Sequence, residues 1–127
     1  MFGCLLSTNI IHLPLENEKT VLDLKQKIDS SDIFTLLDVR DAAQISICKI
    51  KSALSLPLRQ ILHAPTLAAK TLRRISPVAP IFVVCRRGLD SRIATTELLK
   101  LGFPNVYDVA GGLDAWRRHV DPYFPEY

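Results

Sequence analysis

The sequence contains no apolar run long enough to cross a membrane, no internal repeat and no low-complexity tract. Its longest purely apolar stretches, such as residues 81–85, have the length of a strand and fall far below the roughly 20 residues that a membrane helix needs. The first residues lack the basic region of a secretory signal, and Phe2 stands where an acylated glycine would be required. These absences predict a cytoplasmic protein with no membrane partner.

The sequence has few cysteines, and their spacing shows no paired motif. The three cysteines, Cys4, Cys48 and Cys85, form no CxxC pair, and an odd number at wide spacing fits neither a disulfide framework nor a zinc site. The sequence also lacks a GxGxxG loop, so neither ATP nor zinc chemistry is expected within these residues. We therefore expect no metal and no cofactor in this domain, and at least one free thiol.

Charge of one sign is not concentrated anywhere. The 16 Lys and Arg exceed the 13 Asp and Glu by a net charge of +3, which is too small and too scattered to indicate a nucleic-acid surface. A chain of 127 residues that is 48% hydrophobic can bury one core without disulfides or metals. The mixed charge of LPLENEKT predicts a lead-in or linker remnant over residues 1–19 and a single domain over residues 20–127.

Strand-like and helix-like segments alternate along the chain. The predicted strands cover residues 34–39, 53–58, 80–85 and 105–112. The predicted helices cover residues 21–28 after a Thr20 cap, 41–49, 59–75 with a break at Pro65, a segment from Asp90 or Ser91 to Gly102, and 113–120. This alternation predicts an α/β fold with a central, mostly parallel sheet flanked by helices on both faces.

Open parallel sheets bind ligands outside the carboxyl ends of their strands. Three predicted strands deliver distinctive residues to that edge: Asp38 and Arg40, Cys85, and Gly111 with Gly112. We expect these residues to lie near one pocket, with Asp38 and Arg40 either orienting a loop or pairing with each other.

Cys85 is the candidate nucleophile. It ends a buried strand and is followed by a short loop and a helix N-terminus, where N–H groups and the helix dipole converge on the sulfur. Such a site favours an anion, either a thiolate or a persulfide. Gly88 allows the loop to curl with positive φ. The residues expected to bind the anion are Arg86, Arg87, Gly88, Leu89, Asp90, Ser91 and Arg92.

Two other cysteine chemistries fit less well. A phosphatase needs an arginine after five loop residues, but Ser91 occupies that position, Arg92 follows it, and Asp90 would repel phosphate. A papain-type hydrolase needs a histidine as general base, and no histidine falls at a predicted strand end. The three histidines, His12, His63 and His119, are therefore expected at the surface. Cys48 is expected in the core, as is Trp116.

Four segments, LLDVR, ISICKIKSALSLPL, VCRRGLDSR and DVAGGLDAW, follow one another in the order and spacing of rhodanese-like sulfurtransferase domains, between about Thr20 and Trp116. The CxxGxDS loop with Asp90, the Ile47-Cys48 pair and the ending FPEY resemble most the C-terminal rhodanese domain of the ubiquitin-activating-like adenylyltransferase and sulfurtransferase family, which serves molybdopterin synthesis and wobble-uridine thiolation of tRNA.

The resemblance implies that Cys85 accepts sulfur from a donor such as a cysteine desulfurase or thiosulfate and holds it as a persulfide on the loop amides. The partner that it implies is a ubiquitin-like sulfur carrier, whose adenylated C-terminus becomes a thiocarboxylate. The adenylating domain that uses ATP and zinc would act in cis or in trans. The alternative is a rhodanese-fold docking module whose thiol does not turn over.

Overall fold

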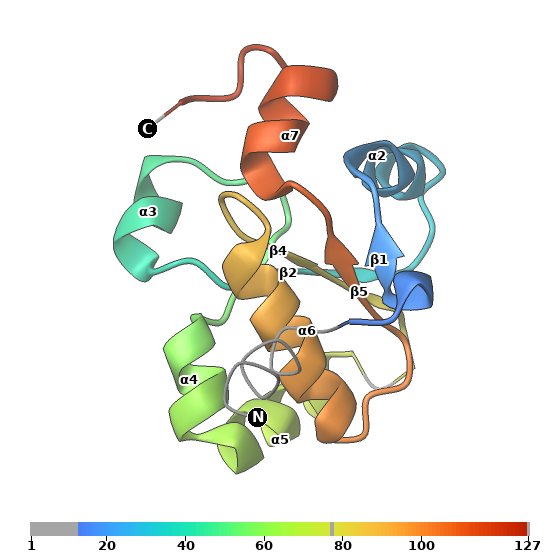
Figure 1. The fold of residues 1–127 in the computed structure, drawn as a ribbon, viewed down its shortest axis with the longest axis vertical. Coiled ribbons are helices and arrows are strands. Elements are labelled where there is room, and N and C mark those ends of the chain that lie inside the picture. The colour runs from blue at the N-terminus through green and yellow to red at the C-terminus, as the bar shows by residue number, and fades with distance from the viewer. Residues whose placement is uncertain (1–12, 77, 127) are drawn as a thin grey trace, which may run out of the picture.

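The computed structural model describes residues 13–76 and 78–126, and its centre is a five-stranded, all-parallel sheet in the order β1-β5-β4-β2-β3 (Figure 1). The strands are β1 (Glu18–Lys19), β2 (Thr35–Asp38), β3 (Leu54–Ser55), β4 (Ile81–Val84) and β5 (Val106–Val109). The helices are η1 (Leu15–Asn17, a 3-10 turn), α2 (Val21–Asp29), α3 (Ala42–Ile47), α4 (Leu58–His63), α5 (Pro65–Ile75), α6 (Leu89–Lys100) and α7 (Gly112–His119). The α/β fold predicted from the sequence is confirmed.

Helices cover both faces of the sheet because the central strands are apolar on both sides. On one face, Leu37, Ile81 and Val83 pack with the buried side chains of α4, α5 and α6. On the other face, Leu36 and Phe82 pack with α2 and α7. Trp116 of α7 belongs to this second core, as expected from the sequence. Successive residues of a central strand therefore pack into the two hydrophobic cores on opposite faces of the sheet in turn.

Local sequence explains where several helices begin and end. Thr20 caps α2 through a capping box, in which its hydroxyl accepts from the Asp23 amide and the Asp23 carboxylate accepts from the Thr20 amide. Pro65 occupies the first turn of α5, where its missing N–H costs nothing, so the helical stretch divides at Ala64. Gly102, with φ +98°, follows the end of α6.

Two predicted boundaries require correction. Residues 13–19, assigned to the lead-in segment, include β1, which pairs with β5, and Leu13, which is buried. A two-residue strand carries too little apolar pattern to be recognised in sequence. The second boundary is the start of α6, which begins at Leu89 with Gly88 as its N-cap, so Asp90 and Ser91 already lie inside the first turn. Cys4 and His12 lie outside the described residues.

No helix in residues 13–76 and 78–126 is long and apolar enough to cross a membrane.

Candidate active site around Cys85

Cys85 follows β4 at the carboxyl edge of the sheet, and its sulfur lies under the loop that leads into α6. The Gly88 amide donates to Sγ at 3.0 Å, and the thiol donates to the Ser91 hydroxyl at 3.3 Å. Cys85 is 4% exposed and Ser91 is 0% exposed. The sulfur is therefore held by a backbone N–H and a buried hydroxyl at the N-terminus of a twelve-residue helix, where a negative charge is stabilised.

The turn between β5 and α7 fixes the path of the loop. Amides of this turn donate to loop carbonyls: Leu113 to Cys85 at 2.8 Å and Asp114 to Arg86 at 2.9 Å. Gly112 makes this approach possible, because a Cβ built there would stand 2.3 Å from the Cys85 carbonyl oxygen. Gly111 also lies close to the loop, since a Cβ on Gly88 would stand 2.8 Å from the Gly111 amide nitrogen. The glycine pair is thus part of the site, as a backbone support.

A pocket of about 220 Å³ opens beside the sulfur. Its lining residues are Arg40, Gln44, Cys85, Arg86, Arg87, Leu89 and Asp90. Arg86 and Arg87 both face Asp114 of α7, with Nε to carboxylate distances of 3.9 and 3.8 Å. These pairs are long and partly exposed, so both guanidinium groups keep positive charge at the pocket. Four of the seven loop residues predicted to bind the anion line this cavity, namely Arg86, Arg87, Leu89 and Asp90, and Asp90 adds one negative charge to it.

Asp38 and Arg40 pair with each other, the second of the two arrangements considered from the sequence. Arg40 Nε contacts both carboxylate oxygens, at 3.0 and 3.1 Å, and Nη2 donates to Oδ2 at 2.7 Å. Nη2 also donates to the Cys48 carbonyl at 2.7 Å. The pair is buried and joins the end of β2 to the end of α3, so Arg40 forms a fixed wall of the pocket.

Arg92 points away from the pocket, in contrast to its neighbours in the loop. Its Nη1 lies 2.6 Å from Glu18 Oε2 and 3.9 Å from Asp108 Oδ2. Arg92 is not among the residues that line the pocket, and its guanidinium group reaches Glu18 of β1 instead. The structure therefore places Arg92 in an ion-pair network with Glu18 and Asp108 and not among the residues that line the pocket.

Two residues near the site, Asp108 and Glu18, were not predicted from the sequence. The Ser91 hydroxyl donates to Asp108 Oδ1 at 2.5 Å, which connects the carboxylate to the cysteine sulfur through one side chain. For Asp108 the sequence does carry a signal, because an acid in the short apolar strand Val106–Val109 is expected to be buried. Asp108 lies on the same face of the strand as the buried Val106. Glu18 carried no comparable signal.

Burial raises the pKa of Asp108 from 3.8 to about 6. The hydrogen bond from Ser91 and the positive charge of Arg92 oppose that rise in pKa, and the negative charge of Glu18 adds to it. Asp108 Oδ2 is buried and accepts no hydrogen bond from the part of the chain that the structure describes. The carboxyl group can therefore change its protonation state near neutral pH.

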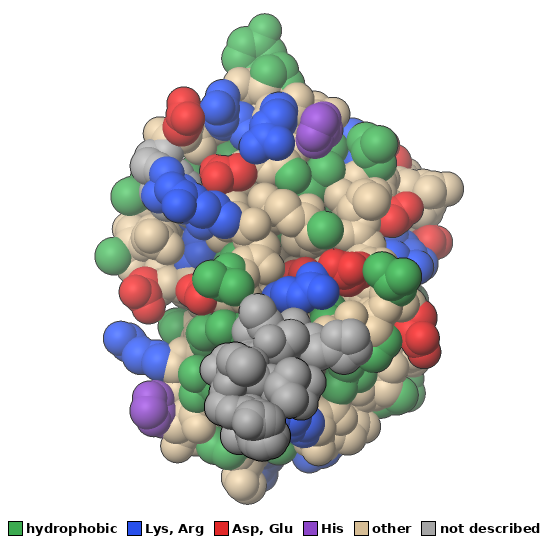
Figure 2. Space-filling view, viewed as in Figure 1, with side chains coloured by type: hydrophobic (Ala, Val, Ile, Leu, Met, Phe, Trp, Pro, Cys, Tyr) green, Lys and Arg blue, Asp and Glu red, His purple; other side chains and the backbone are tan. Residues whose placement is uncertain are grey.

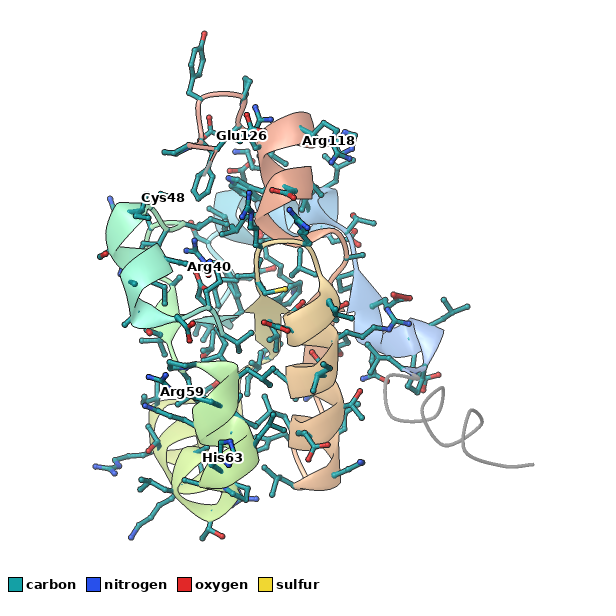
Figure 3. All side chains as sticks on the ribbon, turned by 60° about the vertical axis from the view of Figure 1, so that its left-hand side comes forward. Arg40, Cys48, Arg59, His63, Arg118 and Glu126 are labelled. Carbon is teal, nitrogen blue, oxygen red and sulfur yellow. The ribbon has the colours of Figure 1, made fainter. Side chains whose placement is uncertain are left out.

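The remaining cysteine and histidines lie outside the pocket. Cys48 is half-buried and packs against the core formed with α2 and α7, in line with the predicted core role. His63 and His119 are exposed, and Figure 3 shows His63 on α4, well away from Arg40 at the strand end. No imidazole described by the structure thus faces Cys85, and Arg92 is not placed to clamp a phosphate there.

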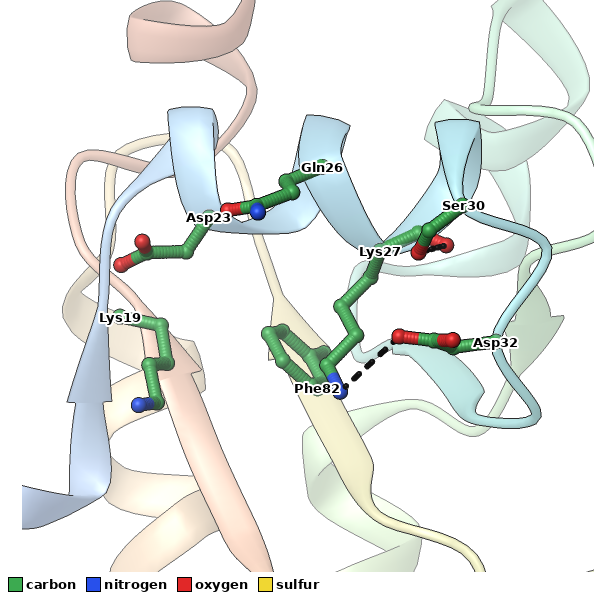
Figure 4. A pocket seen from close by; sticks show the side chains of 7 residues that line it. All are labelled: Lys19, Asp23, Gln26, Lys27, Ser30, Asp32 and Phe82. Carbon is green, nitrogen blue, oxygen red and sulfur yellow. Dashed lines mark hydrogen bonds and ion pairs between the residues drawn. The ribbon is translucent and has the colours of Figure 1, made fainter.

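A second cavity, of about 320 Å³, lies between α2 and the sheet (Figure 4). Three of its polar side chains already make local contacts: Asp23 belongs to the α2 capping box, and Lys27 lies 3.5 Å from Asp32. Its lining residues include no cysteine and no histidine. Within residues 13–76 and 78–126, no three His, Cys, Asp or Glu side chains gather as metal ligands would.

The site is that of a cysteine-dependent α/β domain: one cysteine lies at the end of a central strand, and the loop and helix N-terminus around it can bind an anion. Residues 20–119 match the family described as rhodanese-like domain, and the chain belongs to that family. The expected family membership is thereby confirmed.

Relatives and solved structures agree with this assignment. The chain is 40% identical to the adenylyltransferase and sulfurtransferase MOCS3 of Drosophila grimshawi, over 88% of the chain and 25% of that protein. It is 36% identical to the protein of the same name from Culex quinquefasciatus, over 91% of the chain and 28% of that protein. The rhodanese-like domain of an Anabaena protein matches with a TM-score of 0.70 and 25% identity, over 87% of the chain and 78% of that structure. The chain thus spans about a quarter of the curated relatives' length.

Proposed function

We propose that this chain is a sulfurtransferase domain that carries a persulfide on Cys85. The observation that carries the proposal is the position of Sγ, which accepts the Gly88 amide at 3.0 Å beside a pocket lined by Arg86 and Arg87. A persulfide is more acidic than a thiol, so its terminal sulfur is an anion at neutral pH. Loop amides, the α6 N-terminus and the two arginines all favour an anion there.

The sulfur donor in this proposal is thiosulfate or a protein persulfide such as that of a cysteine desulfurase. The acceptor is the adenylated C-terminus of a ubiquitin-like sulfur carrier. The terminal sulfur of the persulfide attacks the acyl carbon and AMP leaves; a thiol then cleaves the resulting acyl disulfide, and the carrier is left with a thiocarboxylate. The MOCS3 proteins are named adenylyltransferase and sulfurtransferase, and similarity to them supports this pathway. The family resemblance extends the proposal to tRNA wobble-uridine thiolation and molybdopterin synthesis.

A basic rim beside the pocket suits an acidic carrier or donor. Arg117 and Arg118 follow Asp114 by three and four residues on α7, so they share its face of the helix, and Asp114 faces Arg86 and Arg87. Figure 2 shows Lys and Arg side chains gathered in the upper part of the molecule, where α7 lies. Charge complementarity of this kind speeds association and orients the partner.

Intact mass after incubation with thiosulfate tests the proposal. The wild-type chain should gain the mass of one sulfur atom, and a thiol reductant should remove it. Cys85→Ala should gain none, whereas Cys48→Ala and Cys4→Ala should still load. Sulfur on Cys85→Ala would overturn the assignment to Cys85. No loading of the wild type by thiosulfate or by a desulfurase persulfide would leave the chain as a docking module with an idle thiol.

The carrier step has its own test. Carrier, ATP and sulfur donor should yield no thiocarboxylate with this chain alone, because its sequence has no phosphate-binding glycine loop. Supplying an adenylating domain in trans should produce it, in an amount that depends on Cys85. Activation of the carrier by this chain and ATP alone would contradict the proposed division of labour.

A further inference from the structure

A buried chain of hydrogen bonds runs from the Cys85 sulfur into the molecule. The thiol donates to Ser91 Oγ at 3.3 Å, and the Ser91 hydroxyl donates to Asp108 Oδ1 at 2.5 Å. Both donors point from the sulfur toward the carboxylate, which is the direction that a departing thiol proton would take. Ser91 and Asp108 are 0% and 1% exposed, so the inner end of this chain is closed to solvent.

The charges around Asp108 leave its carboxylate weakly stabilised as an anion. From α6, Arg92 Nη1 lies 3.9 Å from Oδ2, but the same nitrogen lies 2.6 Å from Glu18 of β1. From β4, Val83 lies opposite Asp108 in the sheet and offers no charge. Oδ2 accepts no hydrogen bond from the described residues. The nearby cation is thus shared with a second acid, while burial favours the neutral form of Asp108.

We propose that Asp108 is the proton store of Cys85: it accepts the thiol proton through Ser91 as sulfur is loaded, and returns it through Ser91 when sulfur leaves. This inference rests on the proposed persulfide chemistry and deepens it. Asp108 does not touch the reacting sulfur, so it acts only by holding the proton that Ser91 passes on.

The loading step balances with thiosulfate as donor. The S–H bond of Cys85 breaks, its proton passes to Ser91 Oγ, and the Ser91 proton passes to Asp108. The Sγ electron pair forms the new S–S bond, and the S–S bond of thiosulfate breaks with its pair on the departing sulfite. Sγ is formally oxidised and the sulfonate sulfur of thiosulfate is reduced. A thiol, a carboxylate and thiosulfate thus become a persulfide anion, a carboxylic acid and sulfite, with total charge unchanged.

The physical reason for this store is the cost of two adjacent anions. The loaded state places a persulfide anion in the loop, and an ionised Asp108 behind Ser91 would be a second negative charge in a buried region. Neutralising Asp108 keeps one negative charge at the site before and after loading. The negative charge moves from the carboxylate to the sulfur, and the buried region never holds both.

Infrared difference spectroscopy tests the proposal on the whole chain at neutral pH. The spectrum of the sulfur-loaded protein minus that of the free protein should show the C=O band of one newly protonated carboxyl group. Asp108→Asn should lose that band, whereas Asp90→Asn should keep it, although Asp90 also lies beside the pocket. Melting curves establish that each variant is folded.

The outcomes separate this inference from the proposed function. If mass spectrometry finds no sulfur on Cys85, the proposed function fails; if sulfur is present and the wild type shows no new carboxyl band, the proton store fails and the function stands. A band that survives Asp108→Asn also overturns the proposal, and a wild type that lacks the band overturns it even if that variant does not fold.

The role of Ser91 has a separate readout. Ser91→Ala leaves Asp108 in place but removes the hydroxyl between the two groups, so the rate of sulfur loading should fall by about tenfold. Ser91→Thr keeps a hydroxyl and should restore most of that rate. Equal loading rates for Ser91→Ala and the wild type would show that the proton does not travel through Ser91.

Discussion

Arg40 and Asp38 form an ion pair closed to solvent, with Nη2 of Arg40 2.7 Å from Oδ2 of Asp38 and each side chain 1% exposed. The two side chains at the end of β2 thereby neutralise each other's charge. Nη2 of Arg40 also donates a hydrogen bond to the Cys48 carbonyl at the end of α3. Removing either partner leaves a buried charge without its counter-ion, which is the costly way to break such a pair.

We expect Asp38→Ala and Arg40→Ala each to lower the free energy of unfolding by about 3–5 kcal/mol. The control is Lys25→Ala, which breaks the exposed pair of Lys25 and Asp29 on α2 and should cost less than about 1 kcal/mol. Urea denaturation measures all three variants. A similar small loss for the buried and the exposed pair would contradict the structural role given to Arg40.

Gly112 and Gly102 offer a matched comparison, since both have positive φ, +58° and +98°. Alanine at Gly102 meets only Arg73 Nη2 at 3.9 Å, so it carries the conformational cost alone, about 1–2 kcal/mol. Alanine at Gly112 also places a Cβ 2.3 Å from the Cys85 carbonyl oxygen. Gly112→Ala should therefore cost clearly more stability and should impair sulfur loading, whereas Gly102→Ala should load normally. Equal effects would mean that the loop does not depend on the β5–α7 turn.

Asp90 should filter small anionic donors. Its carboxylate lines the pocket and repels the thiosulfate dianion, whereas a protein-bound donor carries less local charge. Asp90→Thr should raise turnover with thiosulfate several-fold, raise turnover with a desulfurase less, and lose part of the gain at high salt. Because Gly88 is the N-cap of α6, Asp90 does not cap the helix, and the substitution should change the melting temperature little. No gain with thiosulfate would exclude the filter.

Asp108 should make stability depend on pH in a direction unusual for an acid. Its pKa is about 6 in the folded protein against 3.8 ordinarily, so between these values the folded state binds more protons than the unfolded state. Its ionisation therefore destabilises the fold as pH rises from about 4 to about 7. The free energy of unfolding of Asp108→Asn minus that of the wild type should increase over this range, as measured by urea denaturation. A difference that does not change with pH would contradict the raised pKa.

Much of the fold could be predicted because most elements carry local signals. The Thr20 cap, the apolar run before Cys85 and the break at Pro65 are properties of neighbouring residues, and the structure confirms the elements that they predicted. β1 was missed because a two-residue edge strand is stabilised by its partner and not by its own pattern. The site divides in the same way: the loop after Cys85 is continuous in sequence, whereas Asp108 joins it only because β5 lies beside β4 and under α6.

Both edge strands of the sheet are very short, since β1 and β3 each contain two residues. Because such short edge strands expose few unpaired backbone N–H and C=O groups, they offer a poor template for an incoming strand. Short edge strands also protect β proteins from self-association. A flexible tail from another protein would therefore gain few main-chain hydrogen bonds by lying alongside the sheet. It would have to approach end-on, toward the sulfur, and be selected by its charge and its terminal group more than by the sequence along its length.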